Sequence, residues 1–285
     1  MSRTVYVNGE YLPEAQAKIS IFDRGFLFAD GIYEVSSVLD GKLLDNAAHL
    51  ARMRRSLREL EMPSPATDEQ IAAVQQELIA RNDLHEGVVY LQITRGAADR
   101  DFAYPADAQP SLVMFTQARA IVDSPAARRG ISVVSMQDIR WQRRDIKTVG
   151  LLAASMAKQA ALNAGADDAW LVEDGLVTEG SSNNAYIVTA DGVLVTRHLS
   201  NEILHGITRA AVLRLSREDN MTVEERAFSL DEAYAASEAF ITSASTFVMP
   251  VVKIDDQVIG TGEPGPVSQR LRELYVDAAR GDPPT

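Results

Sequence analysis

The feature of this chain that most limits its fold is a series of two-residue turn signals between short apolar runs. The signals are Asn8-Gly9, Asp40-Gly41, Asp174-Gly175 and Asp191-Gly192. Asn-Gly and Asp-Gly favour the left-handed backbone conformation that tight hairpins need. The pattern therefore predicts antiparallel hairpins over 4–12 and 30–44. It also predicts short strands at 168–173, 184–189 and 193–196.

Other segments complete a mixed set of elements. Apolar residues recur at helical spacing, as in Leu50, Met53 and Leu57, and this pattern is typical of amphipathic helices. We expect helices at 46–60, 68–79, 152–164, 208–220 and 268–279, and further strands at 88–94, 111–115, 131–135, 223–227, 239–243 and 248–254. Many short strands with few crossover helices predict an α+β fold with barrel-like mixed sheet, and not a doubly wound parallel sheet.

The segment ARAIVDSPAARR at 118–129 has no clear period and contains Ser124-Pro125, which is typical of a connection. A chain of 285 residues suits one large domain or two moderate ones. We therefore predict a smaller N-terminal α/β domain at 1–118, a connection at 119–129 and a larger C-terminal barrel-like mixed domain at 130–285.

Composition excludes several classes of function. A formal net charge of -12 argues against nucleic acid as a partner. The absence of cysteine removes disulfides, thiolate nucleophiles and zinc sites built on sulfur. The four histidines, His49, His85, His198 and His205, do not form a metal-ligand cluster, so no metal is expected. No apolar run is long enough for a signal peptide or a membrane span, so the sequence predicts a cytoplasmic protein.

The stretch DIRWQRRDIKTVGLL at 138–152 carries the first candidate for chemistry. Lys147 follows Arg140, Arg143 and Arg144 and precedes the almost uncharged run TVGLLAASMA. Crowding by cations and loss of water both favour the neutral amine, and a neutral lysine can form a Schiff base with an aldehyde. The alternative is a structural lysine whose head group stays in water.

Two further stretches suggest phosphate binding. His205-Gly206-Ile207-Thr208 places a glycine, backbone N–H groups and a hydroxyl at a predicted helix N-terminus, where anions bind; ordinary capping by Thr208 is the alternative. Arg52 follows His49 on a predicted helix and is either an inward-facing phosphate clamp or a solvated arginine. Phosphate sites beside a Schiff-base lysine indicate pyridoxal 5'-phosphate, which carries an aldehyde and a phosphate.

That cofactor also needs a carboxylate against its pyridine nitrogen. Glu179 is the candidate, because Gly180, Ser181 and Ser182 follow it and let the backbone approach a ligand closely. A surface turn residue is the alternative. Together with Lys147, Glu179 makes the cofactor prediction stronger than either residue alone.

Seven stretches, in order along the chain, resemble the fold-type IV pyridoxal phosphate enzymes and, among them, the D-amino acid transaminases (D-alanine aminotransferases). They are DRGFLFADGIYEV at 23–35, HLARM at 49–53, YLQITRGAADR at 90–100, DIRWQRRDIK at 138–147, TEGSSNNAY at 178–186, ILHGITR at 203–209 and FITSAS at 240–245. The resemblance implies a homodimer with the cofactor at the domain interface. It also implies transfer of an amino group from a D-amino acid to a 2-oxo acid.

The resemblance also implies a role for each matching residue. Lys147 would bind the cofactor and move the proton, and Glu179 would hold the pyridine nitrogen with support from Arg140. The phosphate would be bound by Arg52, Ile207, Thr208, Ser243 and Ala244, and Leu204 would pack on the ring. Tyr33 and Arg100 would bind the substrate carboxylate, and Arg100 would come from the partner subunit.

One position departs from the family pattern. Phe102 stands where these transaminases generally carry a histidine, two residues after the arginine. A phenyl ring cannot donate a hydrogen bond, so we expect weaker carboxylate affinity and more tolerance of hydrophobic groups. Alternatives on the same scaffold are a branched-chain-type L-aminotransferase, an (R)-amine transaminase and an aminodeoxychorismate lyase. A noncatalytic pyridoxal phosphate-binding protein is a more distant alternative.

Overall fold

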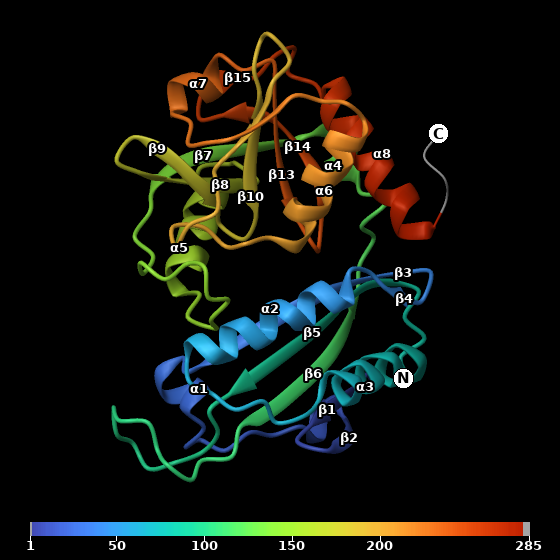
Figure 1. Cartoon of the computed structure of the whole chain (residues 1–285), viewed down its shortest axis with the longest axis vertical. Helices are drawn as coiled ribbons and strands as arrows, with labels where there is room; N and C mark the ends of the chain where they lie inside the picture. Colours follow the sequence, from blue (N-terminus) through green and yellow to red (C-terminus); the bar gives the residue numbers. More distant parts are fainter. Residues whose placement is uncertain (1, 282–285) are drawn as a thin grey trace. The chain divides into compact units, whose positions relative to one another are not determined.

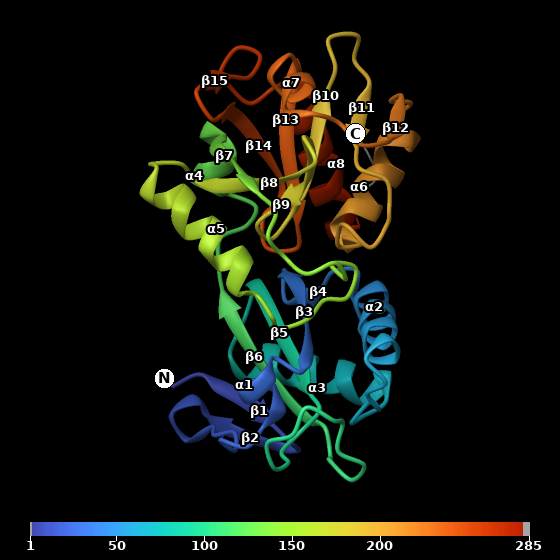
Figure 2. The ribbon, with the colours of Figure 1, turned by 90° about the vertical axis from the view of Figure 1, so that its left-hand side faces the viewer.

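The computed structural model describes residues 2–281. The chain divides into two compact units (Figures 1 and 2). The first unit contains residues 1–120 and 146–151, and the second contains residues 121–145 and 152–285.

The first unit is built on one antiparallel sheet in the order β2-β1-β6-β5-β3-β4. Its strands are β1 (Thr4–Val7), β2 (Glu10–Pro13), β3 (Gly31–Leu39), β4 (Lys42–Leu43), β5 (Glu86–Thr94) and β6 (Ser111–Ala118). Asn8 and Asp40 have φ values of 47° and 51°, so the two predicted N-terminal hairpins are confirmed.

Two amphipathic helices, α2 (Asn46–Glu59) and α3 (Asp68–Arg81), cover this sheet (Figure 1). Their apolar side chains, among them Met53 from α2 and Ile71 from α3, join one core with Leu91 and Ile93 of β5. A capping box between Thr67 and Gln70 starts α3, as expected from hydroxyl and amide pairing at a helix N-terminus. The single-turn helix α1 (Arg24–Phe28) and the 3-10 turn η1 (Glu14–Gln16) complete the unit.

The second unit contains a mixed sheet in the order β12-β11-β10-β13-β14-β7-β8-β9, and β15 pairs with β14. Its strands are β7 (Ile131–Gln137), β8 (Asp168–Glu173), β9 (Leu176–Gly180), β10 (Asn184–Val188), β11 (Leu194–Thr196), β12 (Val223–Glu225), β13 (Glu238–Ser243), β14 (Phe247–Ile254) and β15 (Gln257–Val258). Side chains from most of these strands meet in one core that includes Trp170, Phe228 and Ile241. The curled sheet confirms the predicted α+β class.

Helices cover the second sheet on its outside. They are α4 (Pro125–Arg129), α5 (Leu152–Asn163), α6 (Ile207–Glu218), α7 (Leu230–Tyr234) and α8 (Pro266–Arg280). α5 packs on β7 and β8, and α6 and α8 pack on β13 (Figures 1 and 2). No helix within residues 2–281 has the length and apolar composition needed to cross a membrane.

The elements that the sequence analysis missed are short. The helices α1, α4 and α7 have five residues each, which is too few for a helical period to be visible. The segment predicted as a connection therefore contains α4. Strand β9 was also missed, because Gly180 and the serines that follow it indicate a loop.

The two compact units divide differently from the predicted domains at one segment. The boundary at 120/121 lies within the predicted connection, but Ile146–Leu151, inside the predicted C-terminal domain, belongs to the first unit. The reason is an open strand edge: β4 pairs only with Val38 and Leu39 of β3. The start of β3 therefore pairs with this segment, through Tyr33 N to Lys147 O and Val149 N to Gly31 O, both at 3.0 Å.

Candidate cofactor and substrate site

The first unit holds Lys147 against the aromatic side chain of Tyr33. The two residues are joined by a backbone hydrogen bond, and the Lys147 Nζ lies 4.0 Å from the centroid of the Tyr33 ring. Tyr33 in turn stacks on Tyr90, with ring centroids 5.7 Å apart. Because strand pairing fixes its backbone, Lys147 presents a half-buried amine from a rigid position.

The three arginines that precede Lys147 in the sequence belong to the second unit, and carboxylates neutralise each of them. Arg143 lies 3.1 Å from Asp145, and Arg144 lies 2.7 Å from Glu173. Arg140 forms ion pairs with two carboxylates. The expected crowding of Lys147 by positive charge is therefore not supported, because neighbours in the sequence are matched by anions in the fold.

Arg52 is buried in an ion pair with Glu34. Its Nε and Nη2 donate to the two Glu34 oxygens at 2.8 and 2.7 Å, and His49 Nδ1 lies 2.8 Å from Oε2. Burial alone would raise the pKa of Glu34, but Arg52 and His49 lower it to about 2. Arg52 therefore faces the interior, as predicted, and a carboxylate that the sequence analysis did not single out orients its guanidinium.

The other two predicted substrate residues lie on the loop between β5 and β6. Arg100 and Phe102 are both exposed, and Phe102 is 79% exposed. The Arg100 guanidinium lies 5.3 Å from the centroid of Phe28 and 5.6 Å from that of Phe102. The structure therefore brings Arg100 together with Phe102 of the same loop and with Phe28 of α1.

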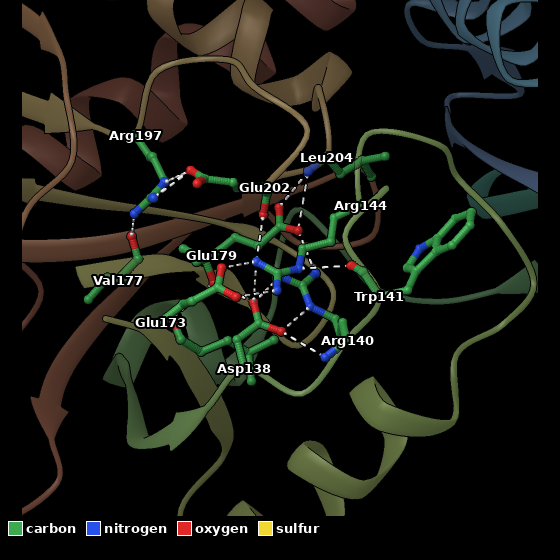
Figure 3. Close-up of polar contacts among 12 residues, drawn as sticks. Asp138, Arg140, Trp141, Arg144, Glu173, Val177, Glu179, Arg197, Glu202 and Leu204 are labelled. Atoms are coloured by element: carbon green, nitrogen blue, oxygen red, sulfur yellow. Dashed lines mark hydrogen bonds and ion pairs between the residues drawn. The ribbon is translucent and has the colours of Figure 1, made fainter. Parts of the chain in front are cut away.

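Glu179, on β9 of the second unit, is a buried carboxylate with three kinds of donor (Figure 3). Arg140 Nη1 donates to Oε1 at 2.6 Å, and Asn184 Nδ2 donates to Oε2 at 2.9 Å. The backbone N–H of Leu204 donates to both oxygens, at 3.2 and 3.1 Å. Glu179 is therefore not a surface turn residue.

A second carboxylate shares Arg140 with Glu179. Asp138 accepts from Arg140 Nε at 3.0 Å and from Nη2 at 2.7 Å, and it also accepts from Thr178. Burial raises the pKa of Glu179; Arg140 opposes this shift, and the nearby Asp138 adds to it. Burial also acts to raise the pKa of Asp138, but its hydrogen bonds and ion pair with Arg140 lower it. Arg140 thus neutralises Asp138 more completely than Glu179.

Asn184 is the residue of this site that the sequence analysis missed. Its Nδ2 donates to Glu179 and also, at 3.0 Å, to the carbonyl oxygen of Leu204. A Cβ on Gly206 would collide with its Oδ1, so only glycine allows this approach. The Asn-Asn pair inside TEGSSNNAY was the available signal, but amides are common in polar loops that bind nothing.

The predicted anion site lies at the start of α6. Gly206 is the N-cap, no side chain caps the helix, and Thr208 is buried inside the first turn. The alternative of capping by Thr208 is therefore wrong. The first backbone N–H groups of α6 have no partner within their own helix, as at any helix start.

The turn after β13 gathers hydroxyl groups. Ser243 Oγ lies 2.8 Å from Thr246 Oγ1 and 3.3 Å from Ser245 Oγ. Ala244 lies in this turn. Thr242, which precedes Ser243, is the register partner of Asn184 on β10. The strand pairing therefore places the hydroxyl turn next to the residue that contacts both Glu179 and Gly206.

Buried arginines fix the two loops that surround Glu179 (Figure 3). Arg144 donates to both Glu173 oxygens and to the carbonyl of Trp141, which holds the loop that follows Asp138. Arg197 donates to Glu202 at 2.5 Å and to the carbonyl of Val177 at 3.0 Å, which holds the loop that leads to Leu204. Within residues 2–281, no group of three or more His, Asp or Glu side chains is arranged to hold a metal ion.

Comparisons with known proteins agree with this arrangement. The family model of amino-transferase class IV matches residues 31–254. The D-alanine aminotransferase of Bacillus licheniformis is 38% identical over 270 residues, which cover 94% of each chain. The D-alanine aminotransferase of Staphylococcus aureus (strain MSSA476) is 36% identical over 274 residues, or 95% of this chain and 96% of the other.

A solved structure is similar over the same extent. The T.th. branched-chain amino acid aminotransferase with pyridoxamine 5'-phosphate has a TM-score of 0.92 and 26% identity, and the match covers 100% of this chain and 96% of that one. These findings confirm the predicted enzyme class, the fold type IV architecture and the pyridoxal 5'-phosphate cofactor. The chain belongs to the class IV aminotransferase family.

Proposed function

We propose that this protein transfers the amino group of D-amino acids to a 2-oxo acid, with pyridoxal 5'-phosphate held by Lys147. The observation that carries the proposal is Glu179, a buried carboxylate whose arginine partner also pairs with Asp138. The D-alanine aminotransferases of Staphylococcus aureus and Bacillus licheniformis, at 36% and 38% identity over nearly the whole chain, support the choice of D-amino acids.

The residues suit this cofactor on chemical grounds. Lys147 supplies a half-buried amine, Glu179 a buried carboxylate, and α6 a helix start without a side-chain cap. When bound, pyridoxal phosphate supplies a conjugated ring that stabilises the negative charge left at the substrate Cα. Lys147 would hold the cofactor and then carry a proton from the substrate Cα to the cofactor carbon C4'.

Glu179 would accept the hydrogen bond of the cofactor's pyridine nitrogen. The Leu204 N–H is shared between both Glu179 oxygens, so a shift of this one donor onto a single oxygen leaves a lone pair for the cofactor. An incoming cationic N–H stabilises the charged form of the carboxylate. Arg140 would keep Glu179 oriented and Leu204 would pack on the ring. Asn184 donates to Glu179 and to the Leu204 carbonyl, and would thereby fix the position of these two residues relative to each other.

The phosphate would be bound by the remaining polar groups. The backbone N–H of Ile207 and the Thr208 hydroxyl lie in the first turn of α6, where the helix dipole favours an anion. Ser243 and Ala244 belong to the hydroxyl turn beside Thr242, and Arg52 would add its charge.

The substrate carboxylate would be bound by Tyr33 and by Arg100 from the partner subunit of a homodimer. A guanidinium binds a carboxylate through two parallel hydrogen bonds, which suits a small amino acid. Phe102 would replace a hydrogen bond with apolar surface and thereby favour hydrophobic side chains or amines. The homodimer and a cytoplasmic location are parts of this proposal.

A branched-chain-type L-aminotransferase is the second candidate, because the T.th. enzyme of that kind has a TM-score of 0.92 to this chain. The higher identity to the D-alanine aminotransferases favours the first candidate. Steady-state rates with D-alanine and L-leucine, each with 2-oxoglutarate, separate the two. Faster turnover of L-leucine would overturn the choice of D-amino acids.

The attachment of the cofactor is tested independently of the substrate. Borohydride reduction of the holoenzyme followed by peptide mass mapping is expected to label Lys147. Lys147→Ala should abolish the visible absorbance and nearly all turnover. Lys253→Ala is the control, because that lysine contacts only Asp256 among described charged groups. A label on another side chain would refute the assignment.

A further inference from the structure

Arg24, on α1, is a buried arginine that joins its helix to the loop between β5 and β6. Its Nε donates to Asp30 Oδ2 at 2.8 Å. Its Nη1 donates to the carbonyl oxygen of Asp101 at 2.6 Å and to that of Ala103 at 3.3 Å. One guanidinium thus connects a carboxylate in the body of the first unit to the carbonyl oxygens of the two residues that flank Phe102.

A second buried arginine uses the same carboxylate. Arg95 Nε donates to Asp30 Oδ2 at 2.8 Å, and its other nitrogens donate to the carbonyls of Leu60 and Glu61 at the end of α2. Two cations therefore share one anion in a buried cluster. Backbone carbonyls supply the acceptors that a second carboxylate would otherwise provide. For Arg24, those carbonyls belong to the loop. The loop therefore satisfies the buried guanidinium, and the guanidinium in turn fixes the loop backbone.

The backbone fixes the two ends of this loop but not its middle. Gly96 has φ 95°, and a Cβ there would collide with the carbonyl oxygen of Gln109, so the two ends meet closely. Arg24 N donates to Gly96 O at 2.9 Å, and Ala98 N donates to Phe22 O at 3.2 Å. Beyond residue 98, the described side-chain contacts from the body of the unit are the Arg24 hydrogen bonds, the stacking of Arg95 on Tyr104 at 3.5 Å, and the contacts of Phe28 with Arg100 and Phe102.

The same part of the unit forms a platform for Arg100. The ring centroid of Phe28 lies 4.6 Å from the Arg24 guanidinium and 5.3 Å from that of Arg100. Phe28 also contacts Phe102, with centroids 5.6 Å apart. No carboxylate within residues 2–281 pairs with Arg100, although Asp99 and Asp101 are its neighbours in the sequence. Its hydrogen-bond donors are therefore available to a ligand.

We propose that Arg24 is a positioning residue that holds segment 97–104 so that Arg100 lies on the Phe28 ring with its donors open to the substrate carboxylate. The inference rests on the proposed function, because Arg100 is taken as the residue that receives the carboxylate. Arg24 acts through Arg100 and does not touch the substrate itself. Loosening the segment should therefore weaken substrate binding more than it slows the chemical step.

Arg24→Lys is the test, because lysine keeps the charge beside Asp30 but lacks the planar fork that reaches the loop at the same time. Hydrogen–deuterium exchange of peptides within 97–104 should become about tenfold faster, with β5 unchanged. The KM for D-alanine should rise about tenfold while kcat stays within about twofold, because only the binding geometry is loosened.

Arg81→Lys is the control: it changes an arginine of the same unit whose described partners, Glu77 and Tyr11, lie outside segment 97–104. Wild-type exchange and KM in Arg24→Lys, or the same changes in Arg81→Lys, would overturn the proposal. If Arg24→Lys does not fold, Phe28→Leu must by itself speed exchange in 97–104, and no change there would equally overturn it. A wild-type enzyme that is inactive toward D-alanine would refute the proposed function. The positioning role of Arg24 could still be tested, because hydrogen–deuterium exchange is measured without substrate.

Discussion

Glu34 in the first unit and Glu179 in the second are both buried carboxylates beside an arginine, yet their pKa values shift in opposite directions. Glu34 is 2% exposed and its pKa is lowered to about 2. Glu179 is 3% exposed and its pKa is raised. Burial acts to raise the pKa in both cases, so the partners decide the difference.

Two basic side chains contact Glu34 directly. Arg52 meets both of its oxygens and His49 adds a third contact, and bidentate pairing of this kind strongly stabilises the charged form. Glu179 receives one Arg140 nitrogen at 2.6 Å, while Asp138 receives two others. The first carboxylate serves as a structural anion, and the second remains able to accept a further donor.

Replacing each carboxylate by its amide should separate the two roles most clearly. Glu179→Gln should lower kcat with D-alanine about a thousandfold, because the pyridine nitrogen loses its acceptor. The fold and the visible absorbance of the cofactor should persist, since Arg140 still has Asp138. Glu218→Gln, at an exposed ion pair with Arg214 in the same unit, is the control and should retain its kcat. A wild-type kcat in Glu179→Gln would show that Glu179 has no role in the catalytic step.

Glu34→Gln should act on stability instead. It leaves the buried Arg52 facing a neutral amide, so the free energy of unfolding should fall by about 3 kcal/mol. Cofactor affinity should weaken because Arg52 loses its orientation, while kcat at saturating cofactor changes little. Urea denaturation and cofactor titration measure the two effects, and Glu77→Gln at an exposed ion pair with Arg81 is the control. Equal loss of kcat in Glu34→Gln and Glu179→Gln would contradict the distinction between a structural Glu34 and a catalytic Glu179.

The pH dependence of stability sharpens the same contrast. In the unfolded chain Glu34 protonates near its ordinary pKa of 4.5, whereas in the folded protein it stays charged down to about 2. The unfolded state therefore binds more protons in this window, and stability falls as the pH drops below 4.5. Between pH 4.5 and 3 the loss should be about 2 kcal/mol.

This acid loss should be absent from Glu34→Gln, and urea denaturation of both proteins across that range measures it. Glu179 contributes with the opposite sign, because its folded pKa lies above the ordinary value. Its contribution to stability is therefore largest at low pH and weakens as the pH rises through the raised pKa. An identical acid dependence in wild type and Glu34→Gln would contradict the assignment.

The smallest expected effect concerns Asn184. Asn184→Ala removes a hydrogen bond to Glu179 and another to the Leu204 carbonyl. We expect kcat/KM for D-alanine to fall about tenfold, equivalent to about 1.4 kcal/mol. Asn183→Ala is the matched control, because it removes a hydrogen bond to Asp168 and none to Glu179. If Asn183→Ala lowers kcat/KM more than Asn184→Ala does, the loss comes from a disturbed loop structure and not from the contact with Glu179.

Local pattern was enough to predict the hairpins, the long helices and the chemical types of the site residues. The Asn8-Gly9 and Asp40-Gly41 turns lie where the sequence indicates, because left-handed backbone at a tight turn is a local requirement. The single-turn helices and β9 were missed, because five residues carry too little periodicity and Gly180 resembles a loop residue. The assignment of Lys147 to the first unit depended on an open strand edge that is far away in the sequence.

By itself, the sequence determined which groups are present: an amine at Lys147, a carboxylate at Glu179 and an arginine at Arg52, within motifs that resemble one family. Only the tertiary structure decided which partners each group has. Glu34 and Arg52 are 18 residues apart, Arg140 and Glu179 are 39 apart, and Arg24 and Asp101 are 77 apart. The charge state of a buried group depends on contacts at such separations, and no local period encodes them.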